Sequence, residues 1–486
     1  MNRRLDDLDR LTTTVTRPDY RPAAHGTGVL HFGVGAFHRA HQAPATDDAL
    51  AHTGGDWRIE GVSLKRPEAA KQLNPQNGLY TLLVRGPGGT RARVIGALGQ
   101  VHTAPEAPER VLDRLADPAV RVVSLTVTEK AYGLDPATGG LDLDHPAIRH
   151  DLATPDRPAG VVGYLVQGLG RRRAAGTPPF TPLSCDNLRE NGSLLRRLAL
   201  DFADRLDPEL RRWIERDVPF PCTMVDRITP ASTERTLADA ARLTGFADHA
   251  AVETEPFVQW VLEDRFASGR PAWEAGGALF VDDVRPYETM KLRMLNGAHS
   301  LIAYLGVLGG LEFVRDVMAR PALASIVSRH MRAAARTLES VPGVDLERYA
   351  SDLATRFANP AIAHHTRQIA MDGTQKLPQR LLEPALVAAE AGSPLDTYAV
   401  AVAAWMRYAS GRDDHGRSID VVDPRDDEIR TALRSGPTSP ADIIDSLVNG
   451  VPGLFPERLA RHRDWREMLE RQLDRLCSRG VIGLTT

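Results

Sequence analysis

Short apolar segments alternate with helical segments through the first part of the chain, and this alternation constrains the fold more than any other feature. The apolar runs end in glycine or in polar residues, and helical patterns such as 194–206 separate them. Strands that alternate with helices are typical of a parallel sheet with helices on its faces. We therefore predict an α/β domain with a parallel sheet, whose strands cover residues 28–33, 57–64, 121–127, 180–184 and 220–225.

The pattern changes near residue 286, where Arg285-Pro286 interrupts the chain. Beyond this point clear strand patterns are absent, and residues 411–426 are expected to form a long polar loop. Helical patterns cover 288–308, 311–319, 321–341, 346–357, 378–391, 395–409 and 456–478. The sequence thus predicts two domains, an α/β domain over 1–285 and a mainly α-helical domain over 286–486.

The composition excludes several classes of function. The net charge is -3, with no long run of one sign, which argues against nucleic acid as the main partner. No apolar stretch approaches the ~20 residues needed to span a bilayer. The first segment, 1–20, is charged and lacks an apolar core, so we expect no signal peptide. A cytoplasmic protein that contacts neither a membrane nor nucleic acid is the prediction.

The cysteines point to the same compartment. Cys185, Cys222 and Cys477 are widely spaced and form neither a metal-binding pattern nor a disulfide framework. A reducing cytoplasm is the simplest interpretation, and we expect no bound metal. The surface composition indicates no partner interface, so the oligomeric state stays open.

A glycine turn follows the first predicted strand and precedes a helical pattern over 37–51. It reads as the start of a Gly-x-Gly-x-x-Gly motif, with His38 in place of the third glycine. Glycines in such a turn let the backbone approach a pyrophosphate at the start of the next helix. His38 and Arg39 are candidates for added cationic contacts. The candidate cofactor residues are Gly33, Val34, Gly35, Ala36, Phe37, His38 and Arg39.

The end of the second predicted strand bears on the choice of cofactor. NAD-binding folds usually place an acidic residue there, where it holds the ribose hydroxyls. This chain instead continues Ser63-Leu64-Lys65-Arg66. We predict NAD as the cofactor. Because Lys65 and Arg66 suit the 2′-phosphate of NADP, NADP is left open as the alternative.

Lysine is rare in this chain, since only five lysines occur among 60 Lys plus Arg. Arginine keeps its proton in proteins, whereas lysine can lose its proton when its pKa falls from ~10.4 toward about 7–8. Lys291 therefore stands out, because Asn296 and His299 follow it on one predicted helix. At about 100° per residue, His299 lies about 80° from Lys291 and about 60° from Asn296.

An amine, an amide and an imidazole on one side of a helix suit chemistry at a carbonyl or a secondary alcohol. The lysine can transfer the proton, the asparagine can stabilise an oxyanion and the histidine can hold a neighbouring hydroxyl. The alternative is an ordinary helix with an exposed lysine, a polar asparagine and a buried structural histidine.

Polar residues at two strand ends favour the first interpretation. Ser184-Cys185-Asp186-Asn187 and Met224-Val225-Asp226-Arg227 each follow or end a predicted strand. Sheets of the α/β class bind ligands at the carboxyl ends of their strands. Either segment alone reads as turn chemistry, but both together, beside a nucleotide turn, favour an active site.

Seven segments of the chain match one known family, namely HFGVGAFHRAHQA (31–43), SLTVTEKAYG (124–133), SCDNLRENG (184–192), FPCTMVDRITP (220–230), EPFVQWVLEDRF (255–266), MKLRMLNGAHS (290–300) and IAMDGTQKLPQR (369–380). Taken together, they resemble the mannitol dehydrogenase family of polyol-specific long-chain dehydrogenases. The likeness covers nearly the whole chain, in order. It implies an N-terminal Rossmann-type dinucleotide-binding domain and a helical catalytic domain with the active site between them. It also implies reversible hydride transfer with a nicotinamide cofactor and no metal.

The resemblance also implies roles for individual residues. Lys291 matches the general acid/base of the family. The other matches are Asn187 and Asn296 as oxyanion-stabilising asparagines, His299 as the substrate-orienting histidine, Asp226 as a contact to substrate or lysine, Glu288 as a carboxylate near the proton path, and Lys376 as a second basic substrate contact.

Details of these motifs favour the branch of the family that acts on ketouronates. Gln368 stands where the mannitol enzymes carry an arginine, and Arg293 where they carry a small residue. A uronate carboxylate needs a cation, and Arg293, Lys376 and Arg380 are the candidates. On a straight helix Arg293 points away from Lys291. We expect interconversion of D-fructuronate and D-mannonate, with a polyol:ketose oxidoreductase such as mannitol 2-dehydrogenase as the alternative.

Overall fold

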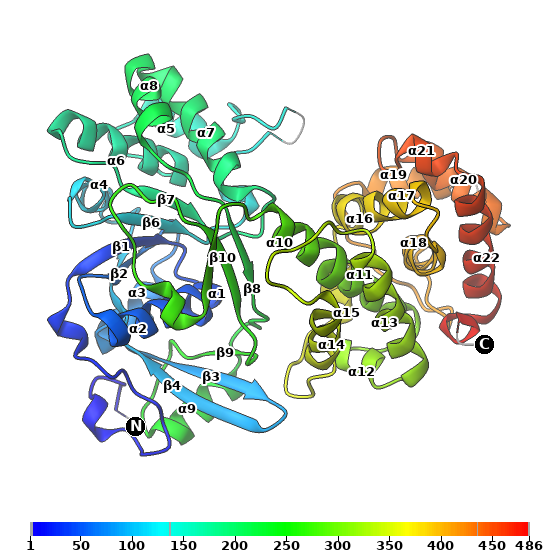
Figure 1. The fold of residues 1–486 in the computed structure, drawn as a ribbon, viewed down its shortest axis with the longest axis horizontal. Helices are drawn as coiled ribbons and strands as arrows, with labels where there is room; N and C mark the ends of the chain where they lie inside the picture. Colours follow the sequence, from blue (N-terminus) through cyan, green and yellow to red (C-terminus); the bar gives the residue numbers. More distant parts are fainter. Residues whose placement is uncertain (1–2, 136–137, 435, 485–486) are drawn as a thin grey trace. The chain divides into compact units, whose positions relative to one another are not determined.

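The computed structural model describes residues 3–135, 138–434 and 436–484. They divide into two compact units, Met1–Arg285 and Pro286–Thr486, which are described separately. Figure 1 shows the strands confined to the first unit and helices filling the second. In the described part of the chain, no helix combines the length and apolar character needed to cross a bilayer.

A five-stranded parallel sheet forms the centre of the first unit, in the order β5-β2-β1-β6-β7. From the first strand the chain moves outward to β2 and β5, and then returns to add β6 and β7 on the other side. Ligands bind at the carboxyl ends of strands where the order reverses in this way, which here is beside β1. The strands are β1 (Thr27–Phe32), β2 (Arg58–Ser63), β5 (Leu98–Thr103), β6 (Val122–Leu125) and β7 (Thr181–Ser184).

Helices cover both faces of this sheet, because successive strand residues point to opposite sides. Leu30 and Phe32 pack with α4 (Pro108–Ala116), α6 (Val161–Ala175) and α7 (Asn191–Leu206), whereas Val29 packs with α2 (Gln42–Thr53). The predicted Rossmann-type fold class is thereby confirmed. The remaining helices of the unit are α1 (Ala36–Ala40), α3 (Glu68–Leu73), α5 (Pro146–Ala153), α8 (Pro208–Asp217) and α9 (Glu234–Thr244).

Two smaller sheets in the first unit differ from the prediction. The strand expected at 220–225 is β8 (Thr223–Asp226), and it pairs antiparallel with β10 (Gln259–Glu263) rather than joining the parallel sheet. β10 in turn pairs with β11 (Ala278–Val281). The third sheet, which the sequence analysis did not predict, contains β3 (Tyr80–Gly86), β4 (Gly89–Ile95) and β9 (Val252–Thr254).

The second unit is mainly helical, as predicted, and among its described residues loops and isolated β-bridges connect the helices. Its central helix, α11 (Gly297–Leu308), is buried along its whole length. The helix expected at 288–308 is not a continuous α-helix, since α10 (Arg285–Met290) and α11 flank a π-helix, η6 (Lys291–Asn296). A second π-helix, η7 (Pro378–Leu382), precedes α17 (Glu383–Glu390).

The remaining helices of the second unit pack against α11 or against one another (Figure 1). The predicted loop over 411–426 is largely irregular. The helices are α12 (Val314–Met318), α13 (Pro321–Ala335), α14 (Leu346–Phe357), α15 (Thr366–Ala370), α16 (Gly373–Leu377), α18 (Asp396–Ala409), α19 (Asp426–Leu433), α20 (Pro440–Gly450), α21 (Glu457–Ala460) and α22 (Arg463–Arg479).

Candidate active site

The two glycines of the turn after β1 have different reasons to be glycine. Gly33 has φ +95°, and a Cβ there would lie 2.0 Å from the carbonyl oxygen of Thr126, so the chain itself requires glycine. Gly35 has ordinary backbone angles, and a Cβ there would meet no atom nearer than 3.9 Å. Packing of the chain therefore does not explain Gly35, and the open space above it is where a pyrophosphate approaches the backbone in folds of this kind.

The side chains of His38 and Arg39 do not serve as the cationic contacts expected from the sequence. His38 is fully buried and stacks on His31, with 3.4 Å between ring centroids, and burial holds its pKa well below the ordinary value. The guanidinium of Arg39 donates to the carbonyls of Ala250 and Gly35. Both side chains therefore support the turn, and any contact from 38 and 39 to a cofactor is left to the backbone.

The helix expected over 37–51 breaks at His41, between α1 and α2. His31 holds the other side of the turn, because its Nε2 lies 3.1 Å from the carbonyl oxygen of Gly33.

At the end of β2, Lys65 and Arg66 are exposed, and no acidic residue directly follows the strand. The structure thus places two cations, and no acidic residue, directly after β2, and NADP stays open as the cofactor.

Asp186 fixes the loop that carries Asn187. Its carboxylate accepts hydrogen bonds from the backbone N–H groups of Val127 (3.1 Å) and Thr128 (3.0 Å) and from the hydroxyl of Tyr132 (2.7 Å). Burial raises the pKa of Asp186, and these hydrogen bonds partly offset the rise. The ends of β6 and β7 are thus tied together, and Asn187 is exposed on the next residue of this fixed segment.

Asn191 links this loop to β8, which carries Asp226. The Asn191 amide donates to the backbone carbonyls of Asp186 (3.1 Å) and Thr223 (3.0 Å), and its oxygen accepts from the Thr223 N–H (2.9 Å). Asp226 ends β8 and is buried. The first unit therefore joins the elements that carry Asn187 and Asp226, through two anchors that the sequence analysis had not assigned.

The π-helix η6 changes the geometry of the lysine and asparagine pair. The Gly297 N–H donates to the carbonyl of Leu292, five residues earlier. On an α-helix, Lys291 and Asn296 would stand about 140° apart. A helix with i→i+5 hydrogen bonds needs more residues per turn, so residues five apart approach the same side. The π-helix therefore aligns Lys291 with Asn296 better than the predicted straight helix does.

Lys291, Asn296 and His299 are all buried, with exposed fractions of 8%, 9% and 7%. Full burial is unusual for a lysine and excludes the alternative of an exposed surface residue. Asn296 Oδ1 and His299 Nε2 have no hydrogen-bond partner among the described residues. Buried polar atoms are normally paired, so these two atoms fit a polar ligand that binds beside Lys291.

His299 lies in a cationic environment. Its ring centroid is 4.6 Å from that of Phe357 and 5.2 Å from that of His364. Burial holds its pKa well below the ordinary value, and the charges of His364, Arg356, Arg380 and Lys291 lower the pKa further. His299 is therefore neutral at physiological pH, which suits a residue that orients substrate through a hydrogen bond.

The second π-helix packs against the first at Gly297. A Cβ at this position would lie 3.0 Å from the carbonyl oxygen of Arg380 and 3.1 Å from Nε2 of His330. The Arg380 guanidinium donates to Ser300 Oγ (3.3 Å), next to His299. This contact places Arg380, one of the three candidate cations for a carboxylate, beside Ser300, and its charge helps to lower the pKa of His299.

The other two candidate cations have structural contacts. Arg293 donates to the backbone carbonyl of Thr337, after α13. Lys376 donates to the carbonyls of Met371 (2.5 Å) and Ile369 (3.3 Å), and burial followed by the charge of Arg380 lowers its pKa. Arg380 is the candidate cation that the structure places beside His299.

Glu288 lies in α10, three residues before Lys291, and is partly buried. Side chains at this spacing are neighbours on a helix, as a carboxylate on the proton path requires. Among the residues that the structure describes, no group of three or more His, Cys, Asp or Glu side chains could hold a metal ion.

Comparisons with known proteins cover both units. A family model for the mannitol dehydrogenase Rossmann domain matches residues 27–275, and one for the mannitol dehydrogenase C-terminal domain matches 283–452. The chain is 44% identical to the D-mannonate oxidoreductase of Escherichia coli (strain K12), over 96% of each chain. It is 37% identical to the polyol:NADP oxidoreductase of Gluconobacter oxydans, over 96% of this chain and 95% of that one.

A solved structure of a mannitol 2-dehydrogenase is also similar to this chain. The ternary complex of Pseudomonas fluorescens mannitol 2-dehydrogenase with NAD and D-mannitol matches with a TM-score of 0.86 and 38% identity, covering 100% of this chain and 99% of that one.

Proposed function

The chain belongs to the mannitol dehydrogenase family, as an NAD(P)-dependent oxidoreductase of polyols or sugar acids, and we propose that it interconverts D-fructuronate and D-mannonate with NAD. The observation that carries the proposal is the buried group of Lys291, Asn296 and His299, with Arg380 beside it. The similarity to a D-mannonate oxidoreductase over 96% of the chain supports the same substrates.

The glycine turn is the part of the first unit that would hold the cofactor, with Gly35 against the pyrophosphate. When bound, the nicotinamide supplies the hydride that adds to the C5 carbonyl carbon of fructuronate. Lys291 donates the proton that the carbonyl oxygen gains, which completes the alcohol of mannonate. In the reverse direction, the same amine removes this proton.

The other side chains stabilise and orient the reacting groups. Asn187 and Asn296 donate hydrogen bonds to the oxygen as it gains charge. His299, which is neutral, holds a neighbouring hydroxyl, and Lys376 provides a second basic contact to substrate. We propose that Asp226 contacts the substrate or Lys291. For Glu288 we propose a place near the path of the proton.

A substrate panel tests the proposed reaction. We expect kcat/KM with NADH and fructuronate to exceed that with fructose by about tenfold or more. Fructose has no carboxylate, so it cannot form the charge-assisted hydrogen bond that fructuronate makes with the proposed cation, Arg380. Each substrate is assayed with NADH and with NADPH, which also settles the role of Lys65 and Arg66. Faster turnover of fructose than of fructuronate contradicts the uronate assignment and favours the mannitol 2-dehydrogenase alternative.

The assignment of Arg380 to the carboxylate makes a second prediction. Replacing Arg380 by glutamine is expected to raise KM for fructuronate about tenfold, since a hydrogen bond to a charged group is lost. NADH affinity is expected to stay the same. Arg293→Gln is the matched comparison, because its guanidinium bonds to the backbone of Thr337. If Arg293→Gln raises KM and Arg380→Gln does not, the carboxylate has been assigned to the wrong arginine.

A further inference from the structure

The second unit contains a cavity of about 720 Å³ that none of the proposed site residues lines. Its walls come from the segment after α11, the start of α13, the end of α18 and the loop that follows it, the end of α22, and the 3-10 helix η8 (Val481–Leu484). Gly309, on its wall, follows His299 by ten residues, or about 15 Å along a helix axis. The volume lies within the range of ~300–1,000 Å³ that is typical of small-molecule sites.

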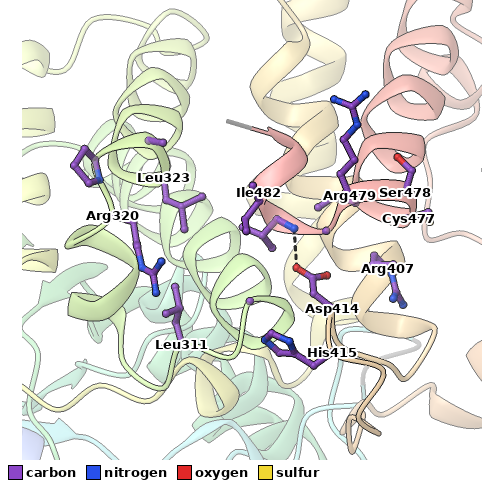
Figure 2. A pocket seen from close by; sticks show the side chains of 16 residues that line it. Leu311, Arg320, Leu323, Arg407, Asp414, His415, Cys477, Ser478, Arg479 and Ile482 are labelled. Carbon is purple, nitrogen blue, oxygen red and sulfur yellow. Dashed lines mark hydrogen bonds between the residues drawn. The ribbon is translucent and has the colours of Figure 1, made fainter. Parts of the chain in front are cut away.

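The lining combines apolar side chains with cations (Figure 2). Figure 2 shows Leu311, Leu323 and Arg320 on one side of the cavity, facing Ile482 and His415 on the other. Ile482 is 76% exposed, which is high for a large apolar residue. An apolar molecule in this cavity would therefore cover a side chain that now faces water.

The charge of the lining is positive. Arg320, Arg407 and Arg479 line the cavity together with one acid, Asp414. Asp414 already accepts a hydrogen bond from the Val481 N–H (2.7 Å), drawn as the dashed line in Figure 2. Arg407 is also engaged, since it donates to Ser410 Oγ (2.9 Å) and to the carbonyl of Arg412 (2.9 Å).

The other two arginines are available to a ligand. Within residues 3–135, 138–434 and 436–484, neither Arg320 nor Arg479 takes part in an ion pair or a side-chain hydrogen bond. Arginine binds carboxylates, sulfonates and phosphates through its planar fork of donors. Figure 2 shows Arg320 beside Leu311 and Leu323, whereas Arg479 lies on the opposite side of the cavity and its guanidinium points away from them. Arg320 next to this apolar wall is suited to a molecule that is anionic at one end and apolar at the other, and Arg479 adds positive charge at the far rim.

We propose that this cavity is a second ligand site, which binds a small organic anion that carries an apolar group. An inorganic anion would leave the apolar wall uncovered, and a neutral apolar molecule would not use the arginines. The site is independent of the proposed reaction, because its lining shares no residue with the lysine, asparagine and histidine of the candidate active site.

Anilinonaphthalene sulfonate has this chemistry and is fluorescent in apolar surroundings, so it serves as the probe. Its affinity for the full chain is measured with saturating NAD present, which keeps the probe out of the cofactor site. We expect the double variant Arg320→Gln, Arg479→Gln to bind it about fivefold more weakly, from loss of charge-assisted hydrogen bonds. Arg329→Gln is the control, since Arg329 is exposed on the same α13 but does not line the cavity.

Two further measurements locate the probe. Phenylnaphthylamine, the neutral analogue, is expected to bind equally to wild type and to the double variant. Cys477 lines the cavity and is exposed, whereas Cys185 and Cys222 are buried, so the sulfonate probe is expected to slow alkylation of Cys477 in the wild-type protein. Unchanged affinity in the double variant, or unchanged alkylation of Cys477 at saturating probe, overturns the proposal.

Discussion

Replacing Lys291 by alanine is expected to lower kcat by about 10²–10⁴-fold, the usual contribution of a general acid or base. The amine is buried beside Asn296 and His299, and His299 cannot replace it as the acid because its pKa is held far below neutrality. The dissociation constant of NADH is expected to stay within about twofold, since the glycine turn lies in the other unit.

Steady-state rates and quenching of protein fluorescence by NADH measure the two quantities. Lys71→Ala is the matched control, because Lys71 is exposed on α3 and has no proposed role. A kcat for Lys291→Ala within tenfold of wild type would falsify the assignment of this lysine as the proton donor.

Replacing Gly35 by alanine is expected to weaken NADH binding by about 100-fold, or ~2.8 kcal/mol, the upper range of the cost of adding a methyl group to a close-packed contact. The melting temperature should stay unchanged, because the protein atom nearest to a Cβ at Gly35 would be 3.9 Å away. The added methyl group therefore acts only on a ligand that approaches the turn.

Gly33→Ala provides the contrast. A Cβ at Gly33 collides with the Thr126 carbonyl, and φ of +95° disfavours any side chain, so we expect a loss of stability of ~2 kcal/mol or more. Thermal unfolding and NADH titration of both variants separate the two effects. Wild-type affinity in Gly35→Ala would show that the cofactor does not contact this residue.

Four strands of the parallel sheet were predictable because they are short, buried and apolar, and each ends at a glycine or a polar residue. The fifth strand, β5, was missed, since Gly99 and Gln100 interrupt its apolar pattern. The same signal could not place β8, since a buried strand looks alike in a parallel and an antiparallel sheet. The β3–β4 hairpin was missed even though Gly86-Pro87-Gly88-Gly89 is a turn signal.

The site was predictable in part. Lys291 stood out by its rarity and by the polar residues that follow it, and the structure buries all three side chains. The π-helix was not predictable, because a shift from i→i+4 to i→i+5 hydrogen bonds leaves no mark in the pattern of apolar residues. Asp186 and Asn191 were missed as anchors, since in the sequence they read as ordinary turn residues.

The π-helix also limits how this part of the chain can vary. Between Lys291 and Gly297 the helix has more residues per turn than an α-helix. The hydrogen bond from the Gly297 N–H to the Leu292 carbonyl closes this wider turn. Loss of one residue would restore the ordinary α-helical pitch and rotate Lys291 by about 100° relative to His299. Evolution and protein engineering can therefore exchange side chains along this segment, but its length is fixed, in contrast to the tolerance for insertions that surface loops show.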